Sequence, residues 1–198
     1  MSYLNFDKKL LINLERSLSK EMIRTNRAGA YNSTTLVDCN TRKYHGQLVL
    51  PLSDPLPEDN YVLLGSLDET VIQHGAEFNL GIHQYGENLY TPNGHKYIRE
   101  FDCEVISKTT YRVGGVILTK ERMLVSFEPR VLIRYTLVEA HSPTTLRLKP
   151  FLARQRCIGI FFSWVSMRIF SQCANAKSKP AAATPFPLSP TAILWITP

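Results

Sequence analysis

The last 59 residues of this 198-residue chain contain no aspartate or glutamate, because Glu139 is the final acidic residue. Seven of the 23 lysines and arginines follow Glu139, so residues 1–139 hold 16 bases and all 17 acids. The formal charge of +6 therefore arises in the C-terminal segment, and the rest of the chain has a net charge of −1. Since nucleic-acid binding needs basic residues concentrated on one folded face, we expect no nucleic-acid partner.

Cysteine is scarce and widely spaced. The chain has four, none of them in a C-x-x-C pair or beside a histidine at metal-ligand spacing: Cys39, Cys103, Cys157 and Cys173. Such spacing predicts free thiols and no metal site. Nothing else in the sequence indicates a cofactor.

Long apolar runs are also missing. The longest apolar cluster, residues 157–165, is about half the roughly 20 residues that a bilayer span requires. Residues 1–9 have neither the apolar run nor the small-residue cleavage site of a signal peptide. We therefore expect no membrane segment and a cytoplasmic location.

The sequence is rich in short β-branched and aromatic runs separated by Gly, Pro, Asn and Asp. These runs predict strands at 36–37, 47–52, 61–66, 70–73, 97–106, 111–120, 123–127, 131–139 and 144–152. Residues 10–23 fit either a helix or short strands. Alternation supports the strand at 131–139, with Val131, Ile133, Tyr135 and Leu137 on one face. The pattern predicts an all-β fold of antiparallel sheets packed as a sandwich.

The strand pattern stops at about residue 153. We expect one domain over residues 1–153, with an incomplete sandwich. The acid-free segment 154–198 is atypical of a soluble domain, whose charged share is about a quarter. We expect this segment to be a frame-shifted or otherwise aberrant tail that is disordered or poorly packed.

Two polar segments, residues 24–35 and 40–46, are too rich in hydrogen-bonding groups and glycine for ordinary core strands. They contain Thr25-Asn26, the Gly29 turn, Ser33-Thr34-Thr35, and Asn40-Thr41-Arg42-Lys43-Tyr44-His45-Gly46 followed by an apolar strand. In order and spacing the sequence resembles the N-terminal domain of bacterial and archaeal-type glycogen debranching enzymes, the amylo-α-1,6-glucosidase family. The resemblance continues at 63–69, 92–94, 99–101, 133–135 and 148–151, and covers roughly residues 4–153.

This resemblance implies a supersandwich-like β-domain that, in full-length enzymes, precedes an α-helical toroid where α-1,6-glucosidic bonds are hydrolysed. The expected partners are an α-glucan such as glycogen and that catalytic toroid. The chain departs from the family pattern at about Arg154, so we expect it to lack the toroid and to be inactive alone. It would position glucan or buttress the catalytic domain. The alternative is a purely structural or interaction module without sugar affinity.

The acidic residues do not form an obvious hydrolytic pair. Glycoside hydrolysis needs two carboxylates facing each other across the scissile bond. Asp68 and Glu69 are adjacent, so on a strand they point to opposite faces. Glu100, Asp102 and Glu104 share one face and are typical of a solvated surface. We predict no catalytic residue in this chain.

Four residues of the polar segments are candidate substrate contacts: Asn26, Arg42, Tyr44 and His45. Tyr44 could stack on a pyranose ring, and Arg42 could hydrogen-bond to sugar hydroxyls or pair with a carboxylate such as Asp38 or Asp68. His45 could contact sugar, act as a base, or be a buried capping residue at a strand start.

Two further groups have structural interpretations. Gly29, Gly46 and Gly94 are expected to supply positive φ in turns. A second aromatic group surrounds residues 92–94 and could form a stacking platform or pack against the core: Tyr85, Tyr90 and Tyr97.

Overall fold

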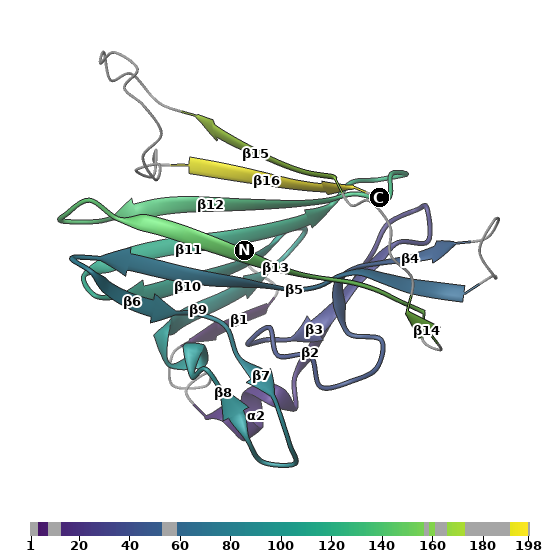
Figure 1. Cartoon of the computed structure of the whole chain (residues 1–198), viewed down its shortest axis with the longest axis horizontal. Coiled ribbons are helices and arrows are strands. Elements are labelled where there is room, and N and C mark those ends of the chain that lie inside the picture. Colours follow the sequence, from purple (N-terminus) through teal and green to yellow (C-terminus); the bar gives the residue numbers. More distant parts are fainter. Residues whose placement is uncertain are drawn as a thin grey trace.

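We describe the chain from a computed structural model, which defines residues 4–7, 13–52, 59–156, 159–160, 166–172 and 191–197. Side chains are described for residues 6–7, 13–52 and 59–152. Most of these residues lie in two antiparallel sheets, which form the layers seen in Figure 1.

The first sheet contains seven of the described strands, in the order β1-β9-β10-β11-β12-β16-β15. Their bounds are β1 Leu4–Asp7, β9 Ile98–Cys103, β10 Ser107–Val113, β11 Val116–Leu124, β12 Val131–Glu139, β16 Thr191–Thr197 and β15 Ser166–Gln172.

The second sheet follows the order β14-β13-β5-β4-β3-β2, with β6 paired to β5. Its strands are β14 Gly159–Ile160, β13 Thr145–Arg156, β5 Asp59–Gln73, β4 Gly46–Leu52, β3 Tyr31–Thr35, β2 Glu21–Thr25 and β6 Ala76–Asn79. Beside these sheets lie the two-stranded pair β7 His83–Gln84 and β8 Tyr90–Thr91, helix α2 Leu14–Leu18 and the 3-10 helix η1 Gly94–Tyr97.

The core lies between the two sheets. On β12, Val131, Ile133 and Tyr135 are at most 1% exposed, whereas Arg134 between them is exposed. The opposite sheet contributes Leu48 and Leu50 of β4, which are buried too. The period-two burial confirms the antiparallel β-sandwich expected from the sequence.

The segment 111–120 is divided between strands β10 and β11. A single strand over 111–120 was wrong, because Gly114 and Gly115 adopt φ of +56° and +81° and reverse the chain. Val113 then pairs directly with Val116 across a two-residue turn. Two residues with positive φ favour the hairpin turn whose twist matches that of the flanking strands.

Other boundaries also differ from the sequence pattern. Residues 61–66 and 70–73 belong to one 15-residue strand, β5, and residues 36–37 form a turn instead of a strand. The ambiguous segment 10–23 contains both a helix and the start of a strand in its described part. Asn13 caps α2 by accepting a hydrogen bond from the Arg16 N–H at 3.0 Å, and β2 begins at Glu21.

The described parts of the segment 154–198 form strands. β13 extends to Arg156, and β16 pairs with β12 from Val131↔Ile196 to Thr136↔Thr191. Residues 173–190, also part of the predicted tail, lie outside the described residues. The domain boundary at residue 153 stays a prediction.

Neither of the helices in the described part of the chain, α2 or η1, is long and apolar enough to cross a membrane.

The glycines have two different structural roles. Gly29 has the expected positive φ, +82°, but Gly46 and Gly94 do not, so the prediction for those two was wrong. Close packing explains both. A Cβ on Gly94 would lie 2.0 Å from the Leu80 carbonyl oxygen, and one on Gly46 would lie 2.9 Å from Val62 Cγ1.

We predict that Gly94→Ala destabilises the fold by about 2 kcal/mol or more, because the added methyl meets backbone that cannot move aside. The matched control is Gly86→Ala, whose added Cβ would meet only Leu89 Cβ at 3.9 Å. Urea unfolding of both variants checks this prediction. Equal stabilities of the two variants would contradict it.

Candidate functional site between the sheets

Two basic side chains of β11 point into the sandwich. Val116, Leu118, Lys120 and Arg122 alternate along the strand and all four are buried. Lys120 is 0% exposed and Arg122 is 4% exposed. Since a buried charge must be paired, these two bases need acidic partners from the opposite layer.

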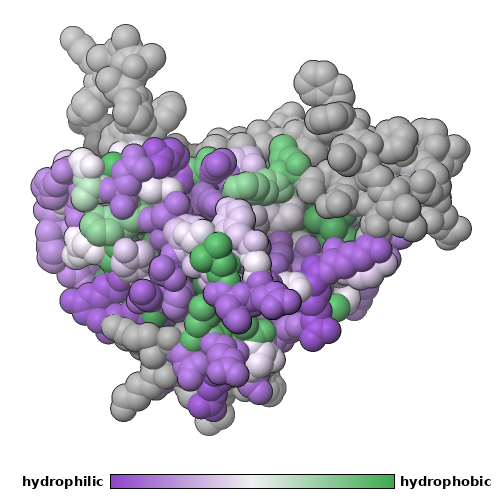
Figure 2. All heavy atoms as spheres, turned by 60° about the horizontal axis from the view of Figure 1, so that its bottom comes forward, coloured by the Kyte–Doolittle hydropathy of each residue, from purple (hydrophilic) through white to green (hydrophobic). Residues whose placement is uncertain are grey.

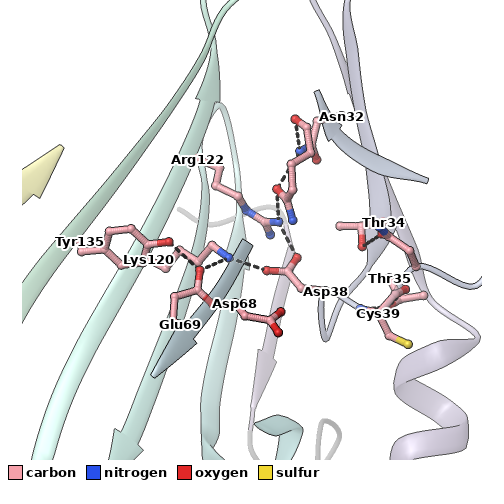
Figure 3. Close-up of polar contacts among 12 residues, drawn as sticks. Asn32, Thr34, Thr35, Asp38, Cys39, Asp68, Glu69, Lys120, Arg122 and Tyr135 are labelled. Atoms are coloured by element: carbon pink, nitrogen blue, oxygen red, sulfur yellow. Dashed lines mark hydrogen bonds and ion pairs between the residues drawn. The ribbon is translucent and has the colours of Figure 1, made fainter. Parts of the chain in front are cut away.

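Lys120 has two carboxylate partners (Figure 3). Its Nζ lies 3.0 Å from Asp38 Oδ2 and 2.6 Å from Glu69 Oε1. Glu69 belongs to β5 of the second sheet and is 2% exposed. It also accepts a hydrogen bond of 2.5 Å from the Tyr135 hydroxyl. One ammonium group therefore joins two acidic residues of different segments.

Arg122 completes the arrangement. Its Nη1 donates to Asp38 Oδ1 and, at 3.0 Å, to Gln47 Oε1. We call Asp38, Glu69, Lys120 and Arg122 the interlayer charge cluster. Its two acids and two bases balance, so the cluster adds no net charge to the interior.

A tight turn after β3 positions Asp38. Asp38 has a left-handed φ of 60°, and its N–H donates to the Thr35 carbonyl at 3.0 Å. The Thr35 hydroxyl donates to the Cys39 carbonyl at 2.9 Å and accepts from the Cys39 N–H at 3.0 Å. The side chain of Thr35 thus holds the turn that directs Asp38 toward Lys120 and Arg122.

Two further bonds attach this turn to the sheet. The Thr34 hydroxyl donates to Asn40 Oδ1 at 3.1 Å, and Asn40 Nδ2 donates to the Gly65 carbonyl at 2.8 Å. Thr34 is 0% exposed. Much of the polar density that distinguishes residues 33–40 is therefore used to build the support of Asp38.

Electrostatics keep Asp38 and Lys120 of the cluster ionised. Burial alone raises the pKa of Asp38, but the charges and hydrogen bonds of Arg122 and Lys120 outweigh burial and lower it from 3.8 to about 2. Burial lowers the pKa of Lys120, while Asp38 and Glu69 raise it above its usual value. Neither group exchanges a proton near neutral pH, so the cluster is suited to holding the sheets together.

The turn at residues 42–45 contains three of the four predicted contact residues. Arg42 has a 70% exposed side chain, and its Nε donates to Glu21 Oε1 at 2.5 Å. Arg42 thus pairs with a carboxylate, but with Glu21 and not with Asp38 or Asp68. Sequence alone could not identify this partner, which lies on another strand.

His45 is buried behind this turn, with 5% of the residue exposed. Its Nδ1 accepts a hydrogen bond of 3.1 Å from the Thr41 N–H, and its Nε2 lies 3.8 Å from Glu21 Oε2. Burial lowers the pKa of His45, an effect that Glu21 opposes and Arg42 reinforces. The arrangement matches the buried, capping alternative for this histidine.

Tyr44 is the aromatic residue of the turn and is 45% exposed. The Lys43 ammonium lies 5.5 Å from the centroid of the Tyr44 ring. Together with Arg42, Tyr44 gives the turn an exposed aromatic and cationic surface.

Asn26 lies apart from the other candidates. Its Nδ2 donates to the carbonyls of Val125 at 3.0 Å and Glu128 at 2.7 Å. Its Oδ1 accepts from the N–H groups of Ala28 and Ala30, both at 2.9 Å. Asn26 comes directly after the last residue of β2, whereas Glu21 is the first residue of that strand. At roughly 3.3 Å per residue, Asn26 and Glu21 lie about 16 Å apart. Its side chain joins the β2–β3 turn to the β11–β12 loop.

Of the three tyrosines predicted around residues 92–94, two pack against the core and one is exposed. Tyr97 packs edge-on against Phe78 with centroids 6.2 Å apart, and both Tyr97 and Tyr90 pack against the core. Tyr85 is 65% exposed and lies near His83, with ring centroids 6.2 Å apart.

Comparison with known proteins assigns the chain to a family. The family model described as the N-terminal part of glycogen debranching enzyme matches residues 20–159, more than half of the chain. The chain belongs to this family. The match confirms the resemblance seen in the sequence, and it contains both the interlayer charge cluster and the turn at 42–45. No curated protein and no solved structure matches the chain.

Asp68 and Glu69 of this debranching-enzyme domain have structural partners. Asp68 and Glu69 point to opposite faces as predicted, with Asp68 accepting from His83 Nε2 at 2.8 Å. Glu69 is buried inside the sandwich, where Lys120 pairs with it. Asp38 and Glu69 both contact that lysine. A substrate therefore cannot lie between the two carboxylates, as hydrolysis requires.

Metal-ligating side chains do not gather in the part of the domain that the structure describes, where no group of three His, Cys, Asp or Glu residues could hold a metal ion. Cys39 and Cys103 are free and buried, whereas Cys157 and Cys173 lie outside the described residues.

We predict that Lys120→Met destabilises the domain by about 3–5 kcal/mol, because it leaves Glu69 buried without a cation and leaves Asp38 with Arg122 alone. Lys108→Met on neighbouring β10 is the control, since Lys108 is exposed, and should change stability by about 0.5 kcal/mol or less. Chemical denaturation at pH 7 measures both. A loss below about 1 kcal/mol for Lys120→Met would show that the cluster is not essential.

Acid should weaken the cluster in a defined pH range. Because the folded-state pKa of Asp38 is lowered from 3.8 to about 2, its contribution is complete above pH 4 and is lost as pH falls from about 4 to 2. The loss should be about 2 kcal/mol. Asp38→Asn, which tolerates the left-handed backbone, should be less stable at pH 7 and lose this part of the pH dependence. Urea unfolding at several pH values tests it; an unchanged slope in the variant would argue against the assignment.

Proposed function

We propose that this domain is a non-catalytic part of a debranching-type enzyme in cytoplasmic glycogen metabolism, where it positions α-glucan beside an α-1,6-glucosidase catalytic domain. The family match supports the enzyme context. The observation that carries the glucan contact is the exposed pair Arg42 and Tyr44 on one turn, with 70% and 45% exposure.

The turn is ordered before any ligand arrives. The His45 N–H donates to the Arg42 carbonyl at 3.1 Å, and the Thr41 N–H donates to the His45 ring at 3.1 Å. Glu21 holds the Arg42 guanidinium from the neighbouring strand. A preorganised turn loses little conformational entropy on binding, which favours recognition by few contacts.

The chemistry of the turn suits a neutral sugar. Tyr44 offers an aromatic ring to the apolar face of a pyranose, and Arg42 offers N–H donors to hydroxyls. Two side chains per sugar give weak affinity, which suits a polymer that presents many units.

In this proposal the four candidates have separate roles. Arg42 and Tyr44 touch the sugar, whereas His45 supports the turn from inside. Asn26 uses its hydrogen-bonding groups to fasten two loops, so we assign it a positioning role.

The second candidate is an interaction module that buttresses the catalytic domain without binding sugar. Exposed apolar side chains at the end of the family match favour this alternative: Phe151 and Leu152 of β13 are 38% and 49% exposed. Figure 2 shows a different distribution on the face that carries α2 and the β7–β8 pair, where hydrophobic groups lie separately among hydrophilic ones. Buttressing predicts self-association and no glycogen affinity.

The two functions separate in affinity electrophoresis of the full chain through gels with and without glycogen. We predict that glycogen retards the wild-type chain and that Tyr44→Ala abolishes most of the retardation, because the stacking surface is removed. Tyr85→Ala is the matched control, since Tyr85 is an exposed tyrosine outside the turn.

Unchanged mobility of the wild-type chain in glycogen would favour the buttress. Retardation lost in Tyr85→Ala but retained in Tyr44→Ala would place the glucan contact outside the turn at 42–45.

A further inference from the structure

A cavity of about 370 Å³ lies beside the interlayer charge cluster. Its described lining includes the polar residues Arg24, Asn32, Ser107 and Arg122 and the apolar residues Leu124 and Val131. The volume lies at the lower end of the range for small-molecule sites. It suits one small molecule and not a glucan chain.

Four buried polar atoms of three lining residues have no hydrogen-bond partner within the described structure: Arg24 Nε, Arg122 Nε, Arg122 Nη2 and Asn32 Oδ1. Arg122 and Asn32 are only 4% and 3% exposed. Buried polar groups are nearly always paired, so several orphans around one cavity indicate a ligand that pairs them.

Arg122 presents the edge that recognises oxyanions. Its Nη1 is occupied by Asp38 and Gln47. The orphaned atoms Nε and Nη2 form the side edge of the guanidinium, whose two parallel N–H groups match two oxygens of a carboxylate or phosphate. Lysine has no equivalent edge.

Asn32 adds an acceptor of defined orientation. Its Nδ2 donates to the Gln47 carbonyl at 2.8 Å and to Gln47 Oε1 at 3.0 Å, which assigns the orphaned oxygen to the other side of the amide. A ligand must therefore donate a hydrogen bond as well as accept several.

The charges favour an anion. Asp38 balances Arg122 inside the cluster, whereas Arg24 adds a second guanidinium, held by Cys103 Sγ at 2.8 Å and the Glu104 carbonyl. Glu104 is the acidic residue among the described lining residues and is exposed. An anion in the cavity would meet the half-buried guanidinium of Arg24 and the buried guanidinium of Arg122, which Asp38 already pairs.

We propose that this cavity binds a small hydroxylated oxyanion, a phosphate monoester or a carboxylate. The Arg122 edge binds two anion oxygens, Arg24 Nε donates to a third polar atom, and Asn32 Oδ1 accepts from a ligand hydroxyl. The site lies at the Arg24 end of β2, whereas the turn at 42–45 contacts Glu21 at the other end. It is independent of the proposed glucan contact.

Isothermal titration of the full chain with three matched probes tests the site: glycerol 3-phosphate, D-glycerate and glycerol. We expect saturable one-to-one binding of at least one of the two anions and none of glycerol. Binding of one anion alone identifies the preferred oxyanion. Absence of binding for both anions, or equal binding of glycerol, would overturn the proposal.

Two variants locate the binding. Arg122→Lys keeps the positive charge opposite Asp38 but removes the guanidinium edge formed by Nε and Nη2. Arg24→Lys removes the Nε donor of Arg24, which is less buried than Arg122. Each should weaken anion binding about tenfold or more. The control Arg112→Lys on β10 is exposed and outside the cavity lining, and should bind normally.

Arg24→Lys keeps the test decisive if Arg122→Lys fails to fold. Anion binding of wild-type strength in folded Arg24→Lys, or equal weakening in Arg112→Lys, would contradict a site in this cavity.

Discussion

The balance of two acids and two bases between the sheets is the constraint on which the other parts of the sandwich depend. Lys120 and Arg122 come from β11, while Asp38 and Glu69 come from the other layer. A slip of β11 by one residue would turn both bases outward and leave two carboxylates buried without cations. This penalty favours a single register between the two layers, which apolar side chains alone would fix less specifically. Fixing a register is the best-attested use of buried charges.

The polar segments that distinguish the sequence divide into two tasks. Thr34, Thr35 and Asn40 brace the turn that carries Asp38, whereas Arg42 and Tyr44 stand exposed directly after that brace. A rigid interior and an exposed recognition surface are thus consecutive in the chain. This proximity explains why hydrogen-bonding residues are so dense here: the same short stretch secures the core and presents the side chains to which we assign the glucan contact.

The sequence was sufficient for features that depend on neighbouring residues. Alternation identified β12, and turn chemistry identified an antiparallel sandwich, because both signals are local. Partners distant in sequence could not be predicted. Carboxylates are usually exposed, so nothing in the neighbouring sequence marks Glu69 as a buried acid, and nothing near Arg42 identifies Glu21 as its partner. One signal for the cluster was present. Lys120 and Arg122 continue the alternation of Val116 and Leu118, so they had to face inward, but their acids could be identified only once the layers were placed together.

The pairing of β5 affects how the chain folds during translation. Along one edge β5 meets β4 and β6, its neighbours in sequence, but along the other it meets β13, with Ile72 opposite Thr145 and Tyr61 opposite Arg156. During translation this second edge of a long strand has no partner until β13 leaves the ribosome. Open strand edges recruit other chains, and contacts between distant segments form slowly. The nascent domain therefore passes through an interval in which aggregation competes with folding, and chaperone protection of β5 would matter most then.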